Sequence, residues 1–275
     1  MINLMFCGND RMFDGLLISL ISIAKHTKED LNVYLMTMNL EEENESYKPI
    51  TEEQRKIIEE SIQKRNKNNK VQLIDVTQTY KKELPTNRNK HTHYTPYIFI
   101  RLLSDKIPEL PNKILYLDTD IVCYRDIKEI YNTDMEEYEI AASLDYIGRK
   151  MINRNYMNSG VVLMNLEKIR ENGSFETARE ICIKKRMALP DQTALNKACK
   201  QKVWLPDKCN EQKERKDDTI IRHFSMTIKL LPVPHLKNIK PWQIERVHKE
   251  YKIYDYEDIY NEYLDIKKQD ERNKL

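Results

Sequence analysis

Residues 113–122 read KILYLDTDIV. The apolar run ILYL predicts a buried strand, and two carboxylates, Asp118 and Asp120, follow at its end. Side chains at positions i and i+2 of an extended chain project to the same side, so both carboxylates can face one point. They repel each other unless a cation lies between them or one binds a proton, and hard oxygen ligands suit Mg²⁺ or Mn²⁺. The spacing indicates a metal site, but a helix cap near Asp126 and a solvated second carboxylate explain it equally well.

Strands and helices alternate on both sides of this stretch. Short apolar runs predict strands at 2–7, 33–36, 71–76, 113–117, 140–144 and 161–166. Helical spacing of apolar residues predicts helices at 14–24 with Asp14 as the cap, from 51 or 52 onward, at 96–104, at 174–187 and at 191–200. This alternation is typical of an α/β fold with a mixed, mostly parallel sheet flanked by helices. Ligands bind beyond the carboxyl ends of the strands in such sheets, which is where Asp118 and Asp120 fall.

The composition excludes two familiar ways of binding phosphates. The 275 residues include only 5 glycines, where average usage would give roughly 19. No GxGxxG fingerprint and no GxxxxGK[ST] loop occurs, which excludes a standard dinucleotide-binding site and a P-loop. A formal net charge of +2 argues against a dedicated nucleic-acid-binding protein.

The cysteines and the first residues indicate a cytoplasmic protein. The five cysteines form no CxxC pair, which suits a reducing compartment, and Cys7 and Cys123 lie in apolar runs typical of buried strands. The N-terminus has no basic region or cleavage site of a signal peptide. The apolar stretch 16–24 is too short to span a bilayer, which takes roughly 20 residues.

The last forty residues form a helical, tyrosine-rich segment. Residues 236–275 contain nine Lys or Arg and nine Asp or Glu. This balance favours packing on the preceding domain or on a partner subunit of a homo-oligomer over weak peripheral contact with the inner membrane face. We therefore divide the chain into an α/β domain at 1–235 and a helical extension at 236–275.

Two histidines precede a short basic and aromatic motif, Lys240-Pro241-Trp242. The neutral imidazole of His223 or His235 is a suitable additional metal ligand, and Lys240 is a point charge suited to a phosphate. Taken alone, each histidine is more readily explained as a partly buried polar residue.

Polar residues also lie at the starts of two later elements. Asn158 precedes an apolar strand, and Asp191 lies where a helix N-cap is expected. Capping accounts for Asp191 but not for Gln192, whose amide can face a cleft instead.

Taken together, these elements resemble glycosyltransferase family 8, which includes bacterial lipopolysaccharide galactosyl- and glucosyltransferases and glycogenin. The resemblance covers nearly the whole chain, with the motifs in the family's order. The segments that carry it are FCGNDRMFDGLLISLISI (6–23), RLLSDKIPELPNKILYLDTDIV (101–122), YMNSGVVLMNL (156–166), PDQTALN (190–196) and KPW (240–242). The resemblance implies a GT-A fold, a UDP-sugar donor, Mn²⁺ or Mg²⁺, and transfer of a hexose with retention to a glycan or lipopolysaccharide-type acceptor.

The same resemblance assigns roles to individual residues. It implies that Asp118 and Asp120 bind the metal, together with a histidine, and that Lys240 contacts the diphosphate. Gln192 lies closest to the anomeric face, and Asp191 beside it is the second residue assigned to catalysis. The residues that it implies for donor binding are Cys7, Asn9, Arg11, Arg101, Asp118, Asp145, Asn158, Ser159 and Lys240.

The chain departs from the family's pattern at two places. The family opens A-x-D-x-N-Y, whereas Asn9, Arg11 and Met12 stand at those positions here, so uridine specificity is less firmly indicated than donor binding. The family's metal histidine lies six residues before the lysine of KPW, whereas His235 lies five before it. His223 has the family's strand context and is slightly favoured, so both histidines are candidate ligands.

Two other functions share some of these features. A sugar nucleotidyltransferase has an α/β fold and uses a metal, but its glycine-rich, basic N-terminal loop is absent from this sequence. A non-catalytic module that only binds a nucleotide sugar would keep the scaffold and lose turnover. The intact DTD, Asp191-Gln192 and KPW motifs favour an enzyme over both alternatives.

Overall fold

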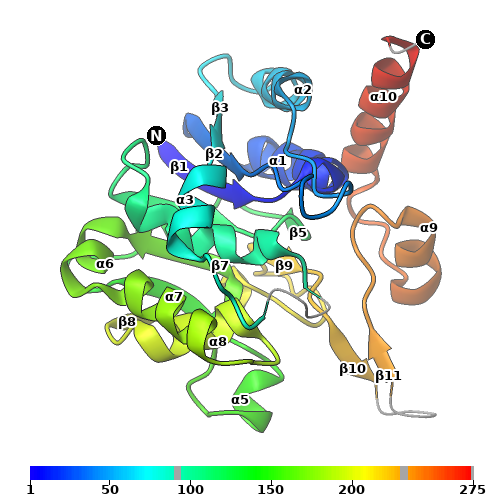
Figure 1. Cartoon of the computed structure of the whole chain (residues 1–275). Coiled ribbons are helices and arrows are strands. Elements are labelled where there is room, and N and C mark those ends of the chain that lie inside the picture. The colour runs from blue at the N-terminus through cyan, green and yellow to red at the C-terminus, as the bar shows by residue number, and fades with distance from the viewer. Residues whose placement is uncertain (90–93, 230–234, 274–275) are drawn as a thin grey trace.

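The fold is built on a seven-stranded sheet, in the order β3-β2-β1-β4-β7-β6-β8 (Figure 1). The computed structural model describes residues 1–89, 94–229 and 235–273. The sheet strands are β1 (Ile2–Cys7), β2 (Leu31–Thr37), β3 (Lys70–Asp75), β4 (Lys113–Leu117), β6 (Ile140–Leu144), β7 (Met157–Asn165) and β8 (Lys202–Trp204). All run in one direction except β7, which is antiparallel to both its neighbours. The predicted mixed, mostly parallel sheet is confirmed.

Side chains of each strand alternate between two hydrophobic cores, one on each face of the sheet. In β4, Leu115 and Leu117 belong to one core, and Ile114 and Tyr116 belong to the other. The first core is covered by α1 (Phe13–His26), α2 (Glu52–Gln63) and α10 (Glu257–Asn273). The second is covered by α3 (Thr77–Glu83), η2 (Pro96–Lys106), α6 (Leu166–Asn172), α7 (Ser174–Lys184) and α8 (Pro190–Ala198).

Two small two-stranded sheets accompany the seven-stranded sheet. Strand β5 (Ile121–Cys123) pairs antiparallel with β9 (Ile221–His223), and β10 (Thr227–Lys229) pairs antiparallel with β11 (His235–Lys237). Because β5 follows β4 after three residues, this pairing brings residue 223 next to the end of β4. The remaining short helices are η1 (Asp10–Met12), α4 (Lys128–Tyr131), α5 (Gly148–Met151), η3 (Asp207–Cys209), α9 (Ile244–Arg246) and the π-helical turn η4 (Val247–Tyr251).

Two expected helix caps are wrong. The 3-10 turn η1 leads directly into α1, so Asp14 lies inside the first turn and its carboxylate pairs with Lys267 at 2.9 Å. Helix α8 begins at Pro190, which places Asp191 inside the helix rather than at its cap. By contrast, Thr51 caps α2 and forms a complete capping box with Gln54.

Two other elements differ from their predicted form. The segment predicted as a helix at 96–104 is helical but winds as the 3-10 helix η2. The strand predicted from residue 161 begins at Met157, because its first residues already pair with β6.

The C-terminal segment packs on the first core. It begins in β11 and becomes helical from Ile244, and α10 lies against α1 (Figure 1). Tyr256, Ile259 and Tyr260 are buried, and the Tyr260 hydroxyl donates a hydrogen bond to the Pro241 carbonyl at 2.8 Å. Across the described ranges, no helix combines the length and the apolar character that crossing a membrane requires.

A buried arginine joins three helices over the second core. Arg179 of α7 is 2% exposed, and its two terminal nitrogens donate to both oxygens of Asp105, at 2.6 and 3.1 Å. Its Nε lies 3.3 Å from a carboxylate oxygen of Glu83, at the end of α3. Removing one partner of a buried ion pair leaves the other charge uncompensated, which typically costs 3–5 kcal/mol.

We predict that Arg179→Ala lowers the free energy of unfolding by about 3–5 kcal/mol, measured by chemical denaturation. The matched control is Lys184→Ala on the same helix, because Lys184 pairs with Glu180 at 2.6 Å on the surface. Exposed pairs contribute less than about 1 kcal/mol. Equal losses in the two variants would contradict a structural role for Arg179.

Candidate active site

A cavity of about 490 Å³ opens where β4 and β6 end and β7 begins. Its size is within the range of small-molecule sites, about 300–1,000 Å³. Ten of the residues that the sequence selects line it, namely Arg101, Asp118, Asp120, Asp145, Asn158, Ser159, Asp191, Gln192, His223 and Lys240. Residues more than 130 positions apart in the sequence therefore meet in one pocket.

The turn between β4 and β5 is held from two sides. The Asp118 amide donates to the Gly160 carbonyl of β7 at 2.8 Å. From α1, the Ser19 hydroxyl lies within hydrogen-bond distance of the carbonyls of Thr119 and Ile121, at 2.9 and 3.0 Å. With the backbone fixed on both sides, the two carboxylates of the DTD motif lie beside the same histidine.

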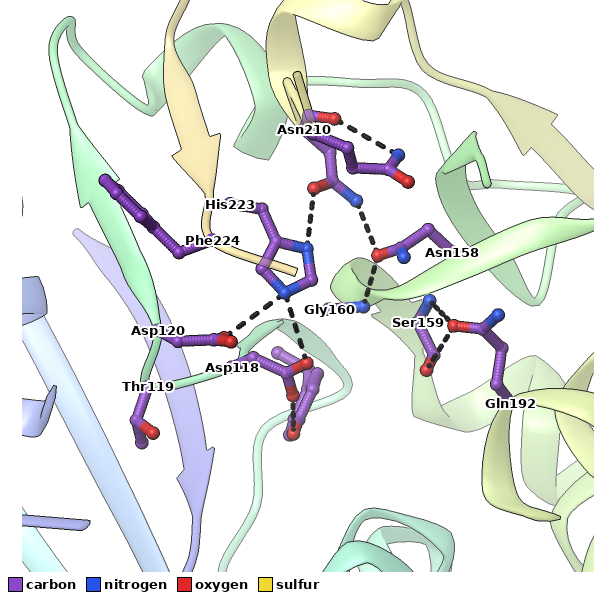
Figure 2. Close-up of polar contacts among 12 residues, drawn as sticks. Asp118, Thr119, Asp120, Asn158, Ser159, Gly160, Gln192, Asn210, His223 and Phe224 are labelled. Atoms are coloured by element: carbon purple, nitrogen blue, oxygen red, sulfur yellow. Dashed lines mark hydrogen bonds and ion pairs between the residues drawn. The ribbon is translucent and has the colours of Figure 1, made fainter. Parts of the chain in front are cut away.

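Asp118, Asp120 and His223 form a cluster that can hold a metal ion (Figure 2). The Nε2 atom of His223 lies 3.2 Å from Asp120 Oδ1 and 3.6 Å from Asp118 Oδ2. One ligand atom from each residue lies within 4.8 Å of the other two. Two carboxylates and an imidazole are a suitable donor set for a divalent cation such as Mn²⁺ or Mg²⁺.

A chain of hydrogen bonds orients the His223 ring (Figure 2). The Gly160 amide donates to Asn158 Oδ1 at 2.9 Å, and Asn210 Nδ2 donates to the same oxygen at 2.9 Å. The Oδ1 atom of Asn210 therefore faces His223 Nδ1, at 3.1 Å. Because an amide oxygen only accepts, Nδ1 carries a proton, so it is the Nε2 lone pair of the neutral ring that can bind a metal.

Gly160 provides the space that this ring occupies. A Cβ atom at position 160 would lie 2.2 Å from His223 Cε1 and 2.9 Å from Asp118 Oδ2. Both distances are shorter than any van der Waals contact, so any other residue would displace the cluster. The glycine is required by the close approach of the imidazole to β7.

Lys240 contacts the metal-binding cluster through Asp120. Its Nζ atom lies 2.5 Å from Asp120 Oδ2 and 3.1 Å from the Phe224 carbonyl. Although burial opposes ionisation of Asp120, Lys240 and His223 hold the pKa of this carboxyl below its usual value. Burial alone would lower the pKa of His223, but Asp120 and then Asp118 raise it.

Arg101 lines the pocket and is 6% exposed. It donates to the Ser159 carbonyl at 2.6 Å and to Asp118 Oδ1 at 3.0 Å, and its Nε lies 3.4 Å from Asp191. Burial opposes its charge, but Tyr116, Asp118 and Asp191 raise its pKa above the usual value. Arg101 thus neutralises carboxylates on two sides of the pocket.

The amide of Gln192 is fixed in one orientation. Its Oε1 accepts hydrogen bonds from the amide and the hydroxyl of Ser159, at 3.0 and 3.2 Å (Figure 2). Its Nε2 donates to Asp145 Oδ2 at 3.2 Å, and Asn158 donates to the same oxygen at 2.9 Å. Burial raises the pKa of the neighbouring Asp191, against the lowering effect of Arg101.

Four sequence-selected residues are not among those that line the pocket in the described part of the chain. Cys7 ends β1 near Arg101 and Asp118, and burial raises the pKa of its thiol. Asn9 is buried before η1, whereas Arg11 is exposed. For His235 only the backbone in β11 is described, so its side chain stays a predicted ligand, and His223 is the histidine found in the cluster.

The structure adds two polar residues that the sequence did not indicate. Asn210 sets the tautomer of His223, as described above. The Gln212 side chain accepts from the Tyr146 amide at 3.0 Å and donates to the Leu144 carbonyl at 2.9 Å, which holds the loop after β6. Neither residue belongs to a recognisable motif, since each acts through partners that are distant in sequence.

We predict that affinity for Mn²⁺ increases with pH. Because the pKa of His223 is raised in the metal-free protein, its proton competes with the metal at low pH. The affinity rises by up to about tenfold per pH unit until His223 has lost its proton, and then levels off. Isothermal titration calorimetry between pH 6 and 8 measures this, and an affinity independent of pH would contradict it.

Asn210→Ala tests the positioning of His223 in the same titration. Loss of a residue that orients a metal ligand typically weakens metal binding about 10- to 100-fold. Asn155→Ala, on the exposed loop before β7, is the control and should match the wild type.

The family model and the similar proteins all point to one family, that of the glycosyltransferases. The model of glycosyl transferase family 8 matches residues 3–243. The glycosyltransferase GlyE of Streptococcus pneumoniae is 29% identical over 196 residues, covering 64% of this chain and 46% of GlyE. A lipopolysaccharide 1,3-galactosyltransferase of Salmonella typhimurium is 28% identical over 155 residues, covering 50% of this chain and 44% of that protein. The chain thus spans about half the length of these relatives.

Solved structures show the same fold. The galactosyltransferase LgtC in complex with donor and acceptor sugar analogues has a TM-score of 0.69 at 18% identity, with 95% of both chains covered. An active-site mutant of LgtC has a TM-score of 0.71 at 16% identity, with the same coverage. These likenesses establish a GT-A-type fold. The family match over residues 3–243 shows that the chain belongs to glycosyltransferase family 8.

Proposed function

We propose that this protein transfers a hexose from a UDP-sugar to a glycan or lipid-linked glycan acceptor, with retention at the anomeric carbon and with Mn²⁺ or Mg²⁺. The observation that carries the proposal is the cluster of Asp118, Asp120 and His223 at the wall of the 490 Å³ pocket, with Lys240 beside it. A diphosphate needs positive charge around it, and the sequence has neither a GxGxxG fingerprint nor a GxxxxGK[ST] loop to supply backbone donors.

The donor set of this cluster fits a divalent cation. Asp118 and Asp120 would supply hard oxygens, and Nε2 of the neutral His223 ring would supply a nitrogen, which Mn²⁺ also accepts. A cation bound there would neutralise the charge that develops on the leaving diphosphate.

Lys240 has a second task in this proposal. Its Nζ lies 2.5 Å from Asp120 Oδ2 and compensates the charge of that carboxylate. If Asp120 bound a metal, its charge would be compensated by that ion, and Lys240 could contact a phosphate oxygen of the donor. A cation at this position stabilises the transition state as the leaving group gains charge.

Retention is proposed to proceed by front-face attack. The Gln192 oxygen, the atom that would otherwise attack the anomeric carbon, already accepts two hydrogen bonds from Ser159. The acceptor hydroxyl therefore forms the new bond to the anomeric carbon as the bond to the donor phosphate breaks. Its proton passes to an oxygen of that phosphate, and Gln192 and Asp191 position the sugar.

The acceptor class rests on the relatives. One of them is named a lipopolysaccharide 1,3-galactosyltransferase, and LgtC was solved with an acceptor sugar analogue. We extend a glycan acceptor of this kind to the present chain. The division at residue 235 and the cytoplasmic location stay predictions.

We predict that Asp120→Asn lowers kcat/KM for UDP-hexose consumption by at least about 100-fold, since it removes a ligand and the partner of Lys240. Lys240→Met should lower kcat more than it raises KM, because its contact strengthens in the transition state. Coupled assays of UDP release measure both effects. Asp126→Asn, outside the pocket, is the control. Full activity of Asp120→Asn would contradict the proposed role of a metal ion.

Gln192 and Asp191 distinguish front-face attack from a covalent mechanism. We predict that Gln192→Ala lowers kcat with little change in donor KM, and that mass spectrometry finds no glycosyl-enzyme in Asp191→Ala. Full transfer by Gln192→Ala together with a trapped glycosyl-enzyme in Asp191→Ala would show this assignment to be wrong.

A further inference from the structure

A second cavity, also of about 490 Å³, adjoins the first. The two share Tyr146, Gln212, His223, Ser225 and Thr227 as lining residues, so they meet beside β9. Beyond that junction the second cavity is lined by residues 213–215 and by residues from 250 to 255. It therefore lies next to the pocket that we propose for the donor.

Arg222 lines this second cavity, and its charge is uncompensated. The residue is 5% exposed, and its Nε is enclosed with no hydrogen-bond partner. No described residue forms an ion pair or a side-chain hydrogen bond with its guanidinium. A buried, unpaired charge is costly, which makes a missing anionic partner the simplest explanation.

Aromatic rings, rather than hydrogen-bond acceptors, lie near the guanidinium of Arg222. Its guanidinium carbon lies 5.1 Å from the ring centre of Phe224 and 5.7 Å from that of Tyr251. Such contacts stabilise the cation but leave its N–H donors without oxygens. The aromatic walls also suit the apolar face of a sugar ring.

Two of the three carboxylates that line this cavity have cationic partners, and the third, Glu214, is exposed. Asp255 pairs with Arg215 at 2.7 Å, and Glu250 pairs with Arg246 at 3.0 Å and with Lys237 at 3.4 Å. A further cation lies at the junction of the two cavities, where Lys213 Nζ is 3.8 Å from the centre of the Tyr146 ring. None of these three carboxylates forms an ion pair with Arg222, whose guanidinium is thus suited to an anion.

We propose that Arg222 binds an anionic group, a phosphate or a carboxylate, carried by the acceptor sugar. A planar guanidinium matches both groups through paired hydrogen bonds. Alternation along β9 points the Arg222 side chain away from that of His223, so it is not placed to bind the diphosphate held beside Lys240. The assignment of this anion to the acceptor rests on the proposed function, because the donor is taken to fill the first pocket.

The test is a titration of metal-free protein, which avoids any dependence on donor binding. The probes are glucose 1-phosphate and glucuronate, with glucose and inorganic phosphate as comparisons, and NMR or calorimetry measures their affinity. The test variant is Arg222→Met, which keeps an apolar stem. The controls are Arg154→Met, which removes an exposed arginine, and Lys240→Met, which removes the cation of the first pocket.

We expect the wild type, Arg154→Met and Lys240→Met to bind one of the two anionic sugars at least tenfold more tightly than Arg222→Met does. Glucose should bind weakly and equally to all four proteins. Since Arg222 leaves no polar partner behind, Arg222→Met should also keep or raise the Tm, whereas a purely structural arginine would lower it.

Three results would overturn the proposal. The first is equal affinity of Arg222→Met and wild type for both anionic sugars. The second is inorganic phosphate binding at Arg222 as tightly as the sugars, which indicates a free-anion site. The third is loss of binding in Lys240→Met, which would place the anion in the first pocket. Failure of the proposed function would be seen separately, as absence of Mn²⁺-dependent UDP binding by the wild type.

Discussion

The buried guanidinium of Arg101 is the interaction on which the pocket depends. It joins Asp118 after β4, the Ser159 carbonyl of β7 and Asp191 of α8, and its guanidinium carbon lies 4.2 Å from the centre of the Tyr116 ring. Without this cation, carboxylates from two different elements would face each other across a small space, and each would favour a bound proton. Arg101 therefore allows the pocket to gather acidic side chains while leaving Asp118 Oδ2 turned toward His223.

The same pocket contains a second set of interacting polar and charged groups, which surrounds Asp120. His223 Nε2 lies 3.2 Å from one carboxylate oxygen of Asp120, and Lys240 Nζ lies 2.5 Å from the other. The hydrogen bonds from Gly160 through Asn158 and Asn210 hold the imidazole in place whichever partner faces it. An imidazole that is held rigidly in this way suits a metal site, because the ligand is already oriented before a metal binds.

Local patterns predicted the sheet well and the polar network poorly. The run KILYL coincides with β4 because a buried strand needs only apolar residues and a turn signal at its end. The cap at Asp14 is wrong because the turn before α1 decides where that helix starts. Asn210 was missed because its role is set by Asn158, 52 residues away, and by His223. Arg222 likewise resembles any strand residue until the cavity behind β9 is known.

The central claim is that a metal ion at Asp118, Asp120 and His223 binds the diphosphate of a nucleotide sugar. The most direct measurement is the affinity of the wild-type protein for UDP, with Mn²⁺ and after removal of metal with a chelator. We predict that UDP binds only in the presence of Mn²⁺, and more tightly than ADP or GDP does. Equal affinity with and without metal, or no binding of any nucleoside diphosphate, would contradict the claim.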